Sequence, residues 1–131
     1  MADEITFDLV SPEKLLLSKA VDMVTVPGAE GYMGVMAGHA PVVSTLRAGM
    51  IDMLDNGVDT RFFIRGGFAE ISASKITVLA EKAVPMSELD LAALDQCISD
   101  AQEDEIAAKT DADRQKAAQL IDDLKLVRAA F

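Results

Sequence analysis

The sequence predicts a β-rich domain followed by a pair of α-helices, and two observations support this fold class. Composition changes at Pro85: valine, isoleucine, threonine and glycine are frequent before it, whereas neither glycine nor proline follows it as far as Phe131. Before Pro85, short apolar runs alternate with turn signals about every 8–12 residues, as in a β-sandwich or a β-barrel. We therefore place a β domain at residues 1–85 and a helical hairpin domain at residues 86–131.

Strict alternation of apolar and polar residues predicts the first strand. Ile5, Phe7 and Leu9 are separated by polar residues, which is the period of a strand with one buried face. Later apolar or β-branched runs predict five further strands in the same domain. We expect these strands at residues 21–26, 49–54, 60–64, 68–71 and 76–79.

Turn signals separate several of these strands. Asn56-Gly57 lies between two apolar runs and predicts a tight hairpin, because both central residues of a type I′ turn need a positive φ. We expect Gly66-Gly67 to turn the chain between two strands, and residues 72–75 to form another short turn.

Residues 27–49 contain five glycines and two prolines. Glycine tolerates positive φ, whereas proline fixes φ near about −65° and donates no backbone hydrogen bond. We therefore expect short strands joined by tight turns rather than one long helix or strand. A segment constrained in this way is either a structural corner or a surface presented to a partner, and the residue types alone leave both open.

The helical domain is expected to hold two antiparallel helices, at residues 88–106 and 111–128. Ser87 and Asp90 resemble a capping box at the start of the first helix, and Thr110 is the expected cap of the second. The connection between the helices is short, which favours antiparallel packing. Apolar residues repeat at helical spacing as Leu91, Leu94, Ile98 and Ala101 in the first helix and as Ala117, Leu120, Leu124, Val127 and Phe131 in the second.

The composition argues against several classes of protein. The net charge of −10 disfavours a protein that binds nucleic acid or an anionic membrane surface, because both need clustered lysine and arginine. No apolar run approaches the ~20 residues of a membrane-spanning helix, so we expect no direct membrane insertion. Cys97 is the single cysteine and cannot form an internal disulfide, which suits a reducing compartment.

Residue types with catalytic chemistry are scarce. His39 is the only histidine, which excludes a metal site built from several histidines. We expect Cys97 to be a packed or half-exposed small residue, and Glu70 and Glu81 to be solvated carboxylates rather than an acid–base pair. The sequence contains no GxxxxGK[ST] phosphate loop. It therefore predicts a binding or coupling module, with no catalytic residue, metal or cofactor, rather than an enzyme.

Two segments carry a family resemblance. The first holds Pro27-Gly28, Glu30-Gly31, Gly34-Val35 and Gly38-His39-Ala40-Pro41, followed by Leu46 and Gly49. The second is residues 66–71, Gly-Gly-Phe-Ala-Glu-Ile, which is followed by Thr-Val-Leu-Ala-Glu at residues 77–81. Together these motifs resemble the epsilon subunit of bacterial F-type ATP synthases. The resemblance covers about residues 4–83 closely and the hairpin by architecture. The homologous delta subunit of the mitochondrial enzyme is made with a transit peptide; none is visible here, so we expect a bacterial origin.

The resemblance implies a β-sandwich of about ten strands followed by an antiparallel two-helix hairpin. It implies a non-catalytic subunit of the central stalk, or rotor, which binds the gamma subunit and the c-ring and couples proton flow to ATP synthesis. Its expected place is the cytoplasmic face of the bacterial inner membrane, as a peripheral part of the complex. In many members the hairpin can reach along gamma between the catalytic alpha and beta subunits and inhibit ATP hydrolysis.

The same resemblance suggests which residues contact the partners. Glu30, Gly31 and Tyr32 form a loop that is expected to lie with the His39 turn at one end of the sandwich, near the c-ring and the base of gamma. The residue type of His39 also allows a different role, in which the imidazole is hydrogen-bonded within its own turn.

If the hairpin is inhibitory, four basic residues of the second helix are expected to form its inhibitory contacts: Arg114, Lys116, Lys125 and Arg128. By resemblance, the catalytic beta subunits carry an acidic segment near the rotor that would attract them. The acidic residues of the first helix, including residues 103–105, oppose this attraction. The sequence therefore leaves the inhibitory role open.

Some members of the family bind ATP through the motif Ile/Leu-Asp-x-x-Arg-Ala near the first helix. Leu94 and Asp95 fit this motif, but Ile98 replaces its arginine and Ser99 its alanine. Loss of the guanidinium removes the strongest phosphate donor, so Asp95 is a weak ATP candidate and we expect no cofactor. Besides the rotor subunit, two alternative functions stay open. The first is an ATP-sensing regulatory subunit, and the second is a β-sandwich adaptor outside any ATPase.

Overall fold

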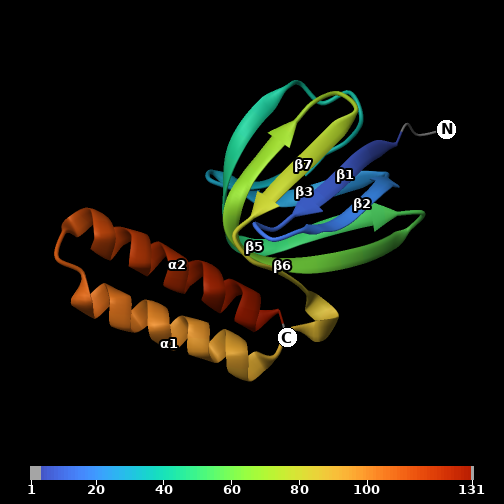
Figure 1. Cartoon of the computed structure of the whole chain (residues 1–131). Coiled ribbons are helices and arrows are strands. Elements are labelled where there is room, and N and C mark those ends of the chain that lie inside the picture. The colour runs from blue at the N-terminus through green and yellow to red at the C-terminus, as the bar shows by residue number, and fades with distance from the viewer. Residues whose placement is uncertain (1–3, 131) are drawn as a thin grey trace. The chain divides into compact units, whose positions relative to one another are not determined.

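A computed structural model describes residues 4–130, which form two compact units divided between Met86 and Ser87 (Figure 1). The first unit contains eight β-strands, and the second contains two α-helices. A short 3₁₀ turn, Met86–Glu88, lies at the division. The change in composition at Pro85 therefore lies next to the point where the strands end.

All the strands of the first unit belong to one sheet. In chain order they are β1 (Ile5–Val10), β2 (Leu15–Val21), β3 (Met23–Gly28), β4 (Gly31–Val35), β5 (Val42–Asp55), β6 (Val58–Ile71), β7 (Lys75–Ala80) and β8 (Ala83–Pro85). Hydrogen-bonded neighbours follow the order β2-β1-β7-β6-β5-β3-β4, and β8 pairs with β6 outside this path. Strands β1 and β7 are parallel, and the other pairs are antiparallel.

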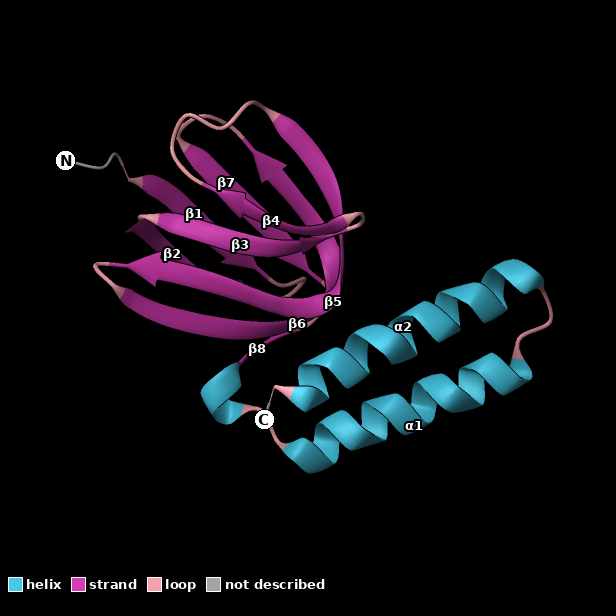
Figure 2. Ribbon diagram, turned by 180° about the vertical axis from the view of Figure 1, so that it is seen from behind, coloured by secondary structure: helices cyan, strands magenta, loops and turns pink. Residues whose placement is uncertain are grey.

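The sheet folds over itself into two layers because β5 and β6 are long and bent. Each has 14 residues, and both curve from one layer into the other (Figures 1 and 2). They pair along their whole lengths, from Val42 opposite Ile71 to Asp55 opposite Val58. The expected β-sandwich is confirmed, with eight strands of which these two serve both layers.

The predicted chain turn at Gly66-Gly67 is wrong, because β6 runs through both residues without ending. Gly66 has φ +118° and Gly67 has φ +148°, so the two glycines bend the strand instead of terminating it. A Cβ atom on Gly67 would lie 2.9 Å from the Cα atom of Ala80 in β7. Glycine is therefore required both for the bend and for the close approach of the neighbouring strand.

The predicted strand at residues 21–26 is divided at Asp22, since Val21 ends β2 and Met23 begins β3. The N–H of Asp22 donates a hydrogen bond to the carbonyl of Leu54 at 2.9 Å. Its carboxylate accepts one from the N–H of Asn56 at 3.0 Å. These two hydrogen bonds fix the corner between β2 and β3 to the β5–β6 hairpin. The run of β-branched residues gives no sign of this corner.

The predicted hairpin at Asn56-Gly57 is confirmed. Asp55 pairs with Val58, and Asn56 and Gly57 have φ values of 52° and 79°, both positive as a type I′ turn requires. The short turn after β6 is also present, with the N–H of Ser72 donating to the carbonyl of Lys75 at 2.8 Å.

Alternate side chains of the strands fill one core between the two layers. Ile5, Phe7 and Leu9 of β1 are fully buried, as the alternation predicts. The other members of the core are Val21, Val24, Val26, Val35, Leu46, Ile51, Met53, Ile64, Ala69, Ile71, Ile76, Val78 and Ala80. Burial of each large aliphatic side chain stabilises the fold by roughly 1.5–3 kcal/mol before entropy is counted.

The second unit is an antiparallel pair of helices, α1 (Leu91–Ala107) and α2 (Asp111–Ala129) (Figure 2). Helix α1 begins later than predicted, because Asp90 rather than Ser87 is its N-cap. The carboxylate of Asp90 accepts a hydrogen bond from the N–H of Ala92 at 2.9 Å.

Thr110 caps α2 as predicted, with its Oγ1 atom accepting a hydrogen bond from the N–H of Asp113 at 3.1 Å. The predicted apolar stripe is only partly buried, since Leu91 is exposed and Ile121 is buried where Leu120 was expected. Phe131 lies outside the described residues. The buried members are Leu94 and Ala101 of α1 and Ala117, Leu124 and Val127 of α2. Neither helix is long and apolar enough to cross a membrane.

Candidate functional site

The loop expected to contact partners is the tight turn between β3 and β4. Gly28 pairs with Gly31, which leaves Ala29 and Glu30 as the two residues of the turn. A Cβ atom on Gly28 would lie 2.9 Å from the carbonyl oxygen of Gly31, so glycine allows the two strands to close. Glu30, Gly31 and Tyr32 are all exposed.

Tyr32 has a structural contact as well as an exposed ring. Its hydroxyl oxygen accepts a hydrogen bond from the backbone N–H of Met50 in β5 at 3.1 Å, although the side chain is 58% exposed. A Cβ atom on Gly49 would lie 2.7 Å from this oxygen. The sequence signals this contact only through the small residue at position 49.

His39 is partly buried and is hydrogen-bonded within its own turn. Its Nδ1 atom lies 2.7 Å from the carbonyl oxygen of Ala40, and because a carbonyl only accepts, Nδ1 donates. Its backbone N–H donates to the carbonyl of Met36 at 3.2 Å, and the N–H of Gly38 donates to the carbonyl of Ala73 at 2.7 Å. This geometry supports the local role that the sequence left open.

The structure does not bring the two predicted contact turns together. The turn at Ala29-Glu30 precedes β4 and the His39 turn follows it, so they lie at opposite ends of this five-residue strand. An extended strand of that length spans roughly 16 Å. The two turns that the resemblance places at one end of the sandwich are therefore separated by the length of β4.

An exposed apolar face on β5, β6 and β7 was missed by the sequence reasoning. Val43, Phe68 and Leu79 are 69%, 54% and 50% exposed. Register aligns Val43 with Glu70 and Thr77, and Thr45 with Phe68 and Leu79, so all six side chains point to one side of the sheet. We call this set the β5–β7 face; its signal in the sequence is the apolar residue at outward positions 43, 68 and 79.

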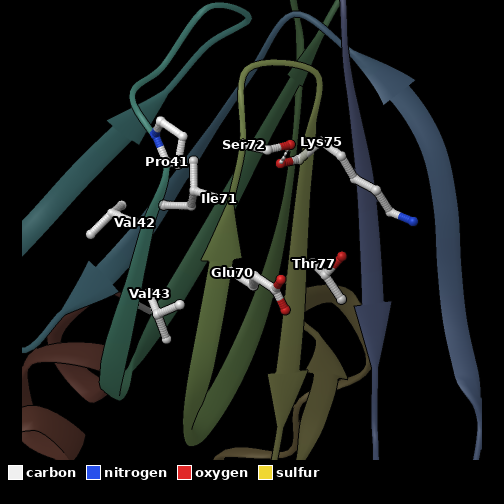
Figure 3. Close-up of a pocket in the computed structure, with 8 residues that line it drawn as sticks. All are labelled: Pro41, Val42, Val43, Glu70, Ile71, Ser72, Lys75 and Thr77. Atoms are coloured by element: carbon white, nitrogen blue, oxygen red, sulfur yellow. Dashed lines mark hydrogen bonds between the residues drawn. The ribbon is translucent and has the colours of Figure 1, made fainter.

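Two shallow depressions adjoin the β5–β7 face. The first, of about 520 Å³, is lined by Pro41, Val42, Val43, Glu70, Ile71, Ser72, Lys75 and Thr77 (Figure 3). The second, of about 480 Å³, lies at the β3–β4 turn and includes Glu30, Tyr32 and Thr45. Val43 lines both, so the apolar face continues into the turn that the resemblance identifies as a contact.

Polar and charged residues of β1, β2 and β7 border this surface. The ammonium group of Lys75 lies 3.0 Å from the carboxylate of Asp8, and the hydroxyl of Ser18 donates to the same carboxylate at 2.6 Å. The Ser18 hydrogen bond, followed by the one from Lys75, holds the pKa of Asp8 below its ordinary value. The border is therefore a neutralised, hydrogen-bonded network rather than a free charge.

Three carboxylates, from Glu4, Asp22 and Asp55, offer oxygen atoms within 4.8 Å of one another. The ammonium of Lys19 lies 2.8 Å from the carboxylate of Asp55, and Asp22 accepts the N–H of Asn56. These carboxylates already have a cation and a donor from the chain, which accounts for their proximity.

In the hairpin, the ATP candidate and one of the predicted inhibitory residues are bound to each other. The Nε atom of Arg128 donates to the carboxylate of Asp95 at 3.0 Å. Arg114 forms an ion pair with Asp111 at 2.8 Å within α2. Lys116 and Lys125 are exposed, and within residues 4–130 the ion pairs found do not include them.

Comparison with known proteins gives a consistent result. The family model of the ATP synthase delta/epsilon chain β-sandwich domain matches residues 4–86. The chain is 54% identical over 129 residues to the ATP synthase epsilon chain of Parvibaculum lavamentivorans, covering 98% of each protein. It is 49% identical over 121 residues to the epsilon chain of Maricaulis maris, covering 92% of this chain and 91% of that one.

Solved structures of ATP synthases contain chains with the same fold. A cryo-EM structure of the Euglena gracilis mitochondrial ATP synthase with OSCP, F1 and the c-ring contains a chain similar to this one, with a TM-score of 0.79 and 25% identity, over 99% of this chain and 82% of that one. The central stalk and c-ring structure from Tetrahymena thermophila contains a chain of the same fold, with a TM-score of 0.72 and 16% identity, over 98% and 97%. From the family model and the curated relatives, the chain belongs to the delta/epsilon family of ATP synthase subunits, within its non-catalytic epsilon branch.

Proposed function

We propose that this protein is a rotor subunit of a proton-translocating F-type ATP synthase, which joins the gamma subunit to the c-ring and couples rotation to ATP synthesis. The similar chain of Euglena gracilis comes from an assembly that holds F1 and the c-ring. The proposal places the protein on the cytoplasmic face of a bacterial membrane, as a peripheral part of the complex.

The β5–β7 face is the observation that carries this proposal. Val43, Phe68 and Leu79 expose apolar surface to water, and covering this surface with a partner protein would be favourable. The surface continues to Tyr32 at the β3–β4 turn. An apolar patch bordered by polar residues is typical of a surface that a partner protein covers. We assign gamma to the β5–β7 face and the c-ring to the Glu30–Tyr32 loop.

A pair of matched valine substitutions tests this assignment. Val43 and Val58 are both on strands and are 69% and 64% exposed, but only Val43 lies on the β5–β7 face. We expect Val43→Lys to reduce co-purification with gamma and ATP-driven proton pumping in membrane vesicles, because the new ammonium would be desolvated in the interface. Val58→Lys should leave both unchanged. Equal behaviour of the two variants would refute the assignment of gamma to this face.

We further propose that the hairpin restrains ATP hydrolysis through cationic contacts of α2 with the catalytic subunits. Lys116 and Lys125 are exposed and available for such contacts. Individual exposed pairs contribute only about 0–1 kcal/mol, so several must act together and the restraint should weaken at high salt. A chain that ends at Met86 retains the whole first unit. Hydrolysis several-fold faster with this truncated chain supports restraint, and an unchanged rate excludes it.

We propose that nucleotide sensing is not part of this function. The Asp95 carboxylate is engaged by Arg128, and the position of the family arginine is occupied by Ile98. Calorimetric titration of the isolated subunit with ATP should show no binding at millimolar concentrations. Binding that is lost in Asp95→Ala would establish the sensing role instead.

A further inference from the structure

We propose that the Asp95–Arg128 ion pair is a clasp that holds the open end of the hairpin closed. While it is closed, Arg128 is not available to an acidic partner. This regulatory step rests on the proposed role of the hairpin in restraining hydrolysis. The clasp itself is a property of the isolated chain and can be tested without the complex.

The position of the pair gives it this leverage. Asp95 lies near the start of α1 and Arg128 in the last turn of α2, so their contact joins the helices at the end opposite the connection through Ala108–Thr110. The Nε–Oδ1 distance is 3.0 Å, which is a charge-assisted hydrogen bond. Three further side-chain bonds each join residues of one helix: Gln96 with Asp100, Arg114 with Asp111, and Gln119 with Asp123.

The apolar contacts of α1 are modest, which makes a single ion pair significant. Only Leu94 and Ala101 of this helix are buried. Alanine contributes little apolar area, so the apolar packing of α1 depends mainly on Leu94, with the half-buried Cys97 and Ile98 beside it. A bond at the open end therefore forms a notable part of what keeps the two helices together.

The charges of the helices determine how the clasp responds to its surroundings. Helix α1 carries five acidic residues and no basic one, whereas α2 carries four of each. Arg128 is thus a cation of α2 that pairs with one of the five carboxylates of α1. Both partners are partly exposed, at 42% for Arg128 and 55% for Asp95, so salt and competing carboxylates can reach them.

This geometry allows the guanidinium of Arg128 to exchange the carboxylate of Asp95 for a carboxylate of a partner protein. Lys116 and Lys125 can meet an acidic surface while the hairpin is closed, because both are exposed. Arg128 joins them only after it leaves Asp95. An acidic segment of a partner protein would therefore open the hairpin by replacing Asp95 as the acceptor of the guanidinium.

The experiment measures separation of the helix ends in the full-length isolated subunit. Spin labels on cysteines placed at Ala92 and Ala129, both exposed, report the width of the open end in a Cys97→Ser background. We expect Arg128→Gln to increase the separated population up to about fivefold, the limit for an exposed ion pair. Arg114→Gln is the matched control: it removes the same charge from the same helix but breaks only the pair with Asp111, so the distances should not change.

Salt and a charge exchange complete the test. Molar salt should separate the ends of the wild-type hairpin as Arg128→Gln does, and should add little in that variant. The double exchange Asp95→Arg with Arg128→Asp should restore the closed distance. An unchanged distance in Arg128→Gln, an equal change in Arg114→Gln, or no rescue by the exchange would overturn the clasp. None of these outcomes depends on hydrolysis, so they are separate from the test of the proposed function.

Discussion

The hydroxyl of Tyr32 accepts the backbone N–H of Met50 at a point where β3 and β5 are not in continuous register. Thr25 pairs with Asp52 and Gly28 with Leu46, so β5 has extra residues between these pairs. Pro27 lies in the same interval and has no N–H to offer. The side chain of Tyr32 thus supplies a hydrogen bond that the ladder lacks, and a residue predicted only as a contact also stabilises the sandwich.

Replacement of Tyr32 by phenylalanine should therefore destabilise the isolated subunit. The N–H of Met50 loses its acceptor while the ring remains, and we expect a loss of about 0.5–1.5 kcal/mol in the free energy of unfolding. Urea denaturation measures this loss, and amide exchange at Met50 should accelerate more than exchange at neighbouring amides. Unchanged stability together with unchanged exchange at Met50 would show that the hydroxyl bond has no structural weight.

Substitution of Gly67 by alanine should be far more costly than the same change at Gly57. Both glycines have positive φ, but only at Gly67 would the new Cβ meet backbone of the neighbouring strand, at 2.9 Å from the Cα of Ala80. We expect about 1–2 kcal/mol for Gly57→Ala from its φ alone, and about 3 kcal/mol or more for Gly67→Ala. Thermal unfolding of the two variants checks the order; similar losses would mean that the strands move apart easily.

Acid should weaken the fold through Asp8. Its pKa in the folded state is lowered from the ordinary value of 3.8, first by the Ser18 hydrogen bond and then by Lys75. The stabilisation is therefore complete above pH 3.8 and is lost as pH falls through the folded value. Asp8→Asn should be less stable than wild type at pH 6, and the difference in stability should shrink as the pH falls below 3.8. Ser18→Ala should reduce this pH dependence. If the free energy of unfolding varies with pH in the same way for wild type, Asp8→Asn and Ser18→Ala, the proposed role of Asp8 is contradicted.

Asp52 should act in the opposite direction. Burial, and then the nearby Asp59 carboxylate, raise its pKa above the ordinary value of 3.8. The folded state binds this proton more tightly than the unfolded state, so its stabilisation is present below pH 3.8 and declines as pH rises through the folded value. We expect Asp59→Asn to stabilise the protein by roughly 0.3 kcal/mol at pH 7 and by less at pH 3. Equal effects at both pH values would rule out repulsion between the two carboxylates.

The sequence predicts most of the fold because its signals are local. Alternation at Ile5, Phe7 and Leu9, the Asn56-Gly57 turn and the Thr110 cap each depend on a few neighbouring residues. Gly66-Gly67 is different, since a glycine pair can end a strand or bend one, and only the contact with β7 decides between them. The corner at Asp22 likewise depends on Leu54 and Asn56, which are distant in the sequence.

The candidate site is less predictable because it depends on which strands are neighbours. Val43, Phe68 and Leu79 come from three strands and form one face only in the observed register. The ion pair between Asp95 and Arg128 similarly depends on the alignment of two helices. The family resemblance singled out Glu30 and Tyr32, which are exposed, but it did not place the His39 turn at the other end of β4.

The two layers of the sandwich are parts of a single hydrogen-bonded sheet, and this has a mechanical consequence. If the layers were separate sheets, they could slide over each other by repacking side chains alone. Here β5 and β6 carry backbone hydrogen bonds from one layer into the other along most of their length. A twisting load on one layer must therefore strain covalent chain and many backbone hydrogen bonds at once. The domain should consequently behave as a stiff elastic element, whose deformation is shared by the whole sheet rather than concentrated at one seam.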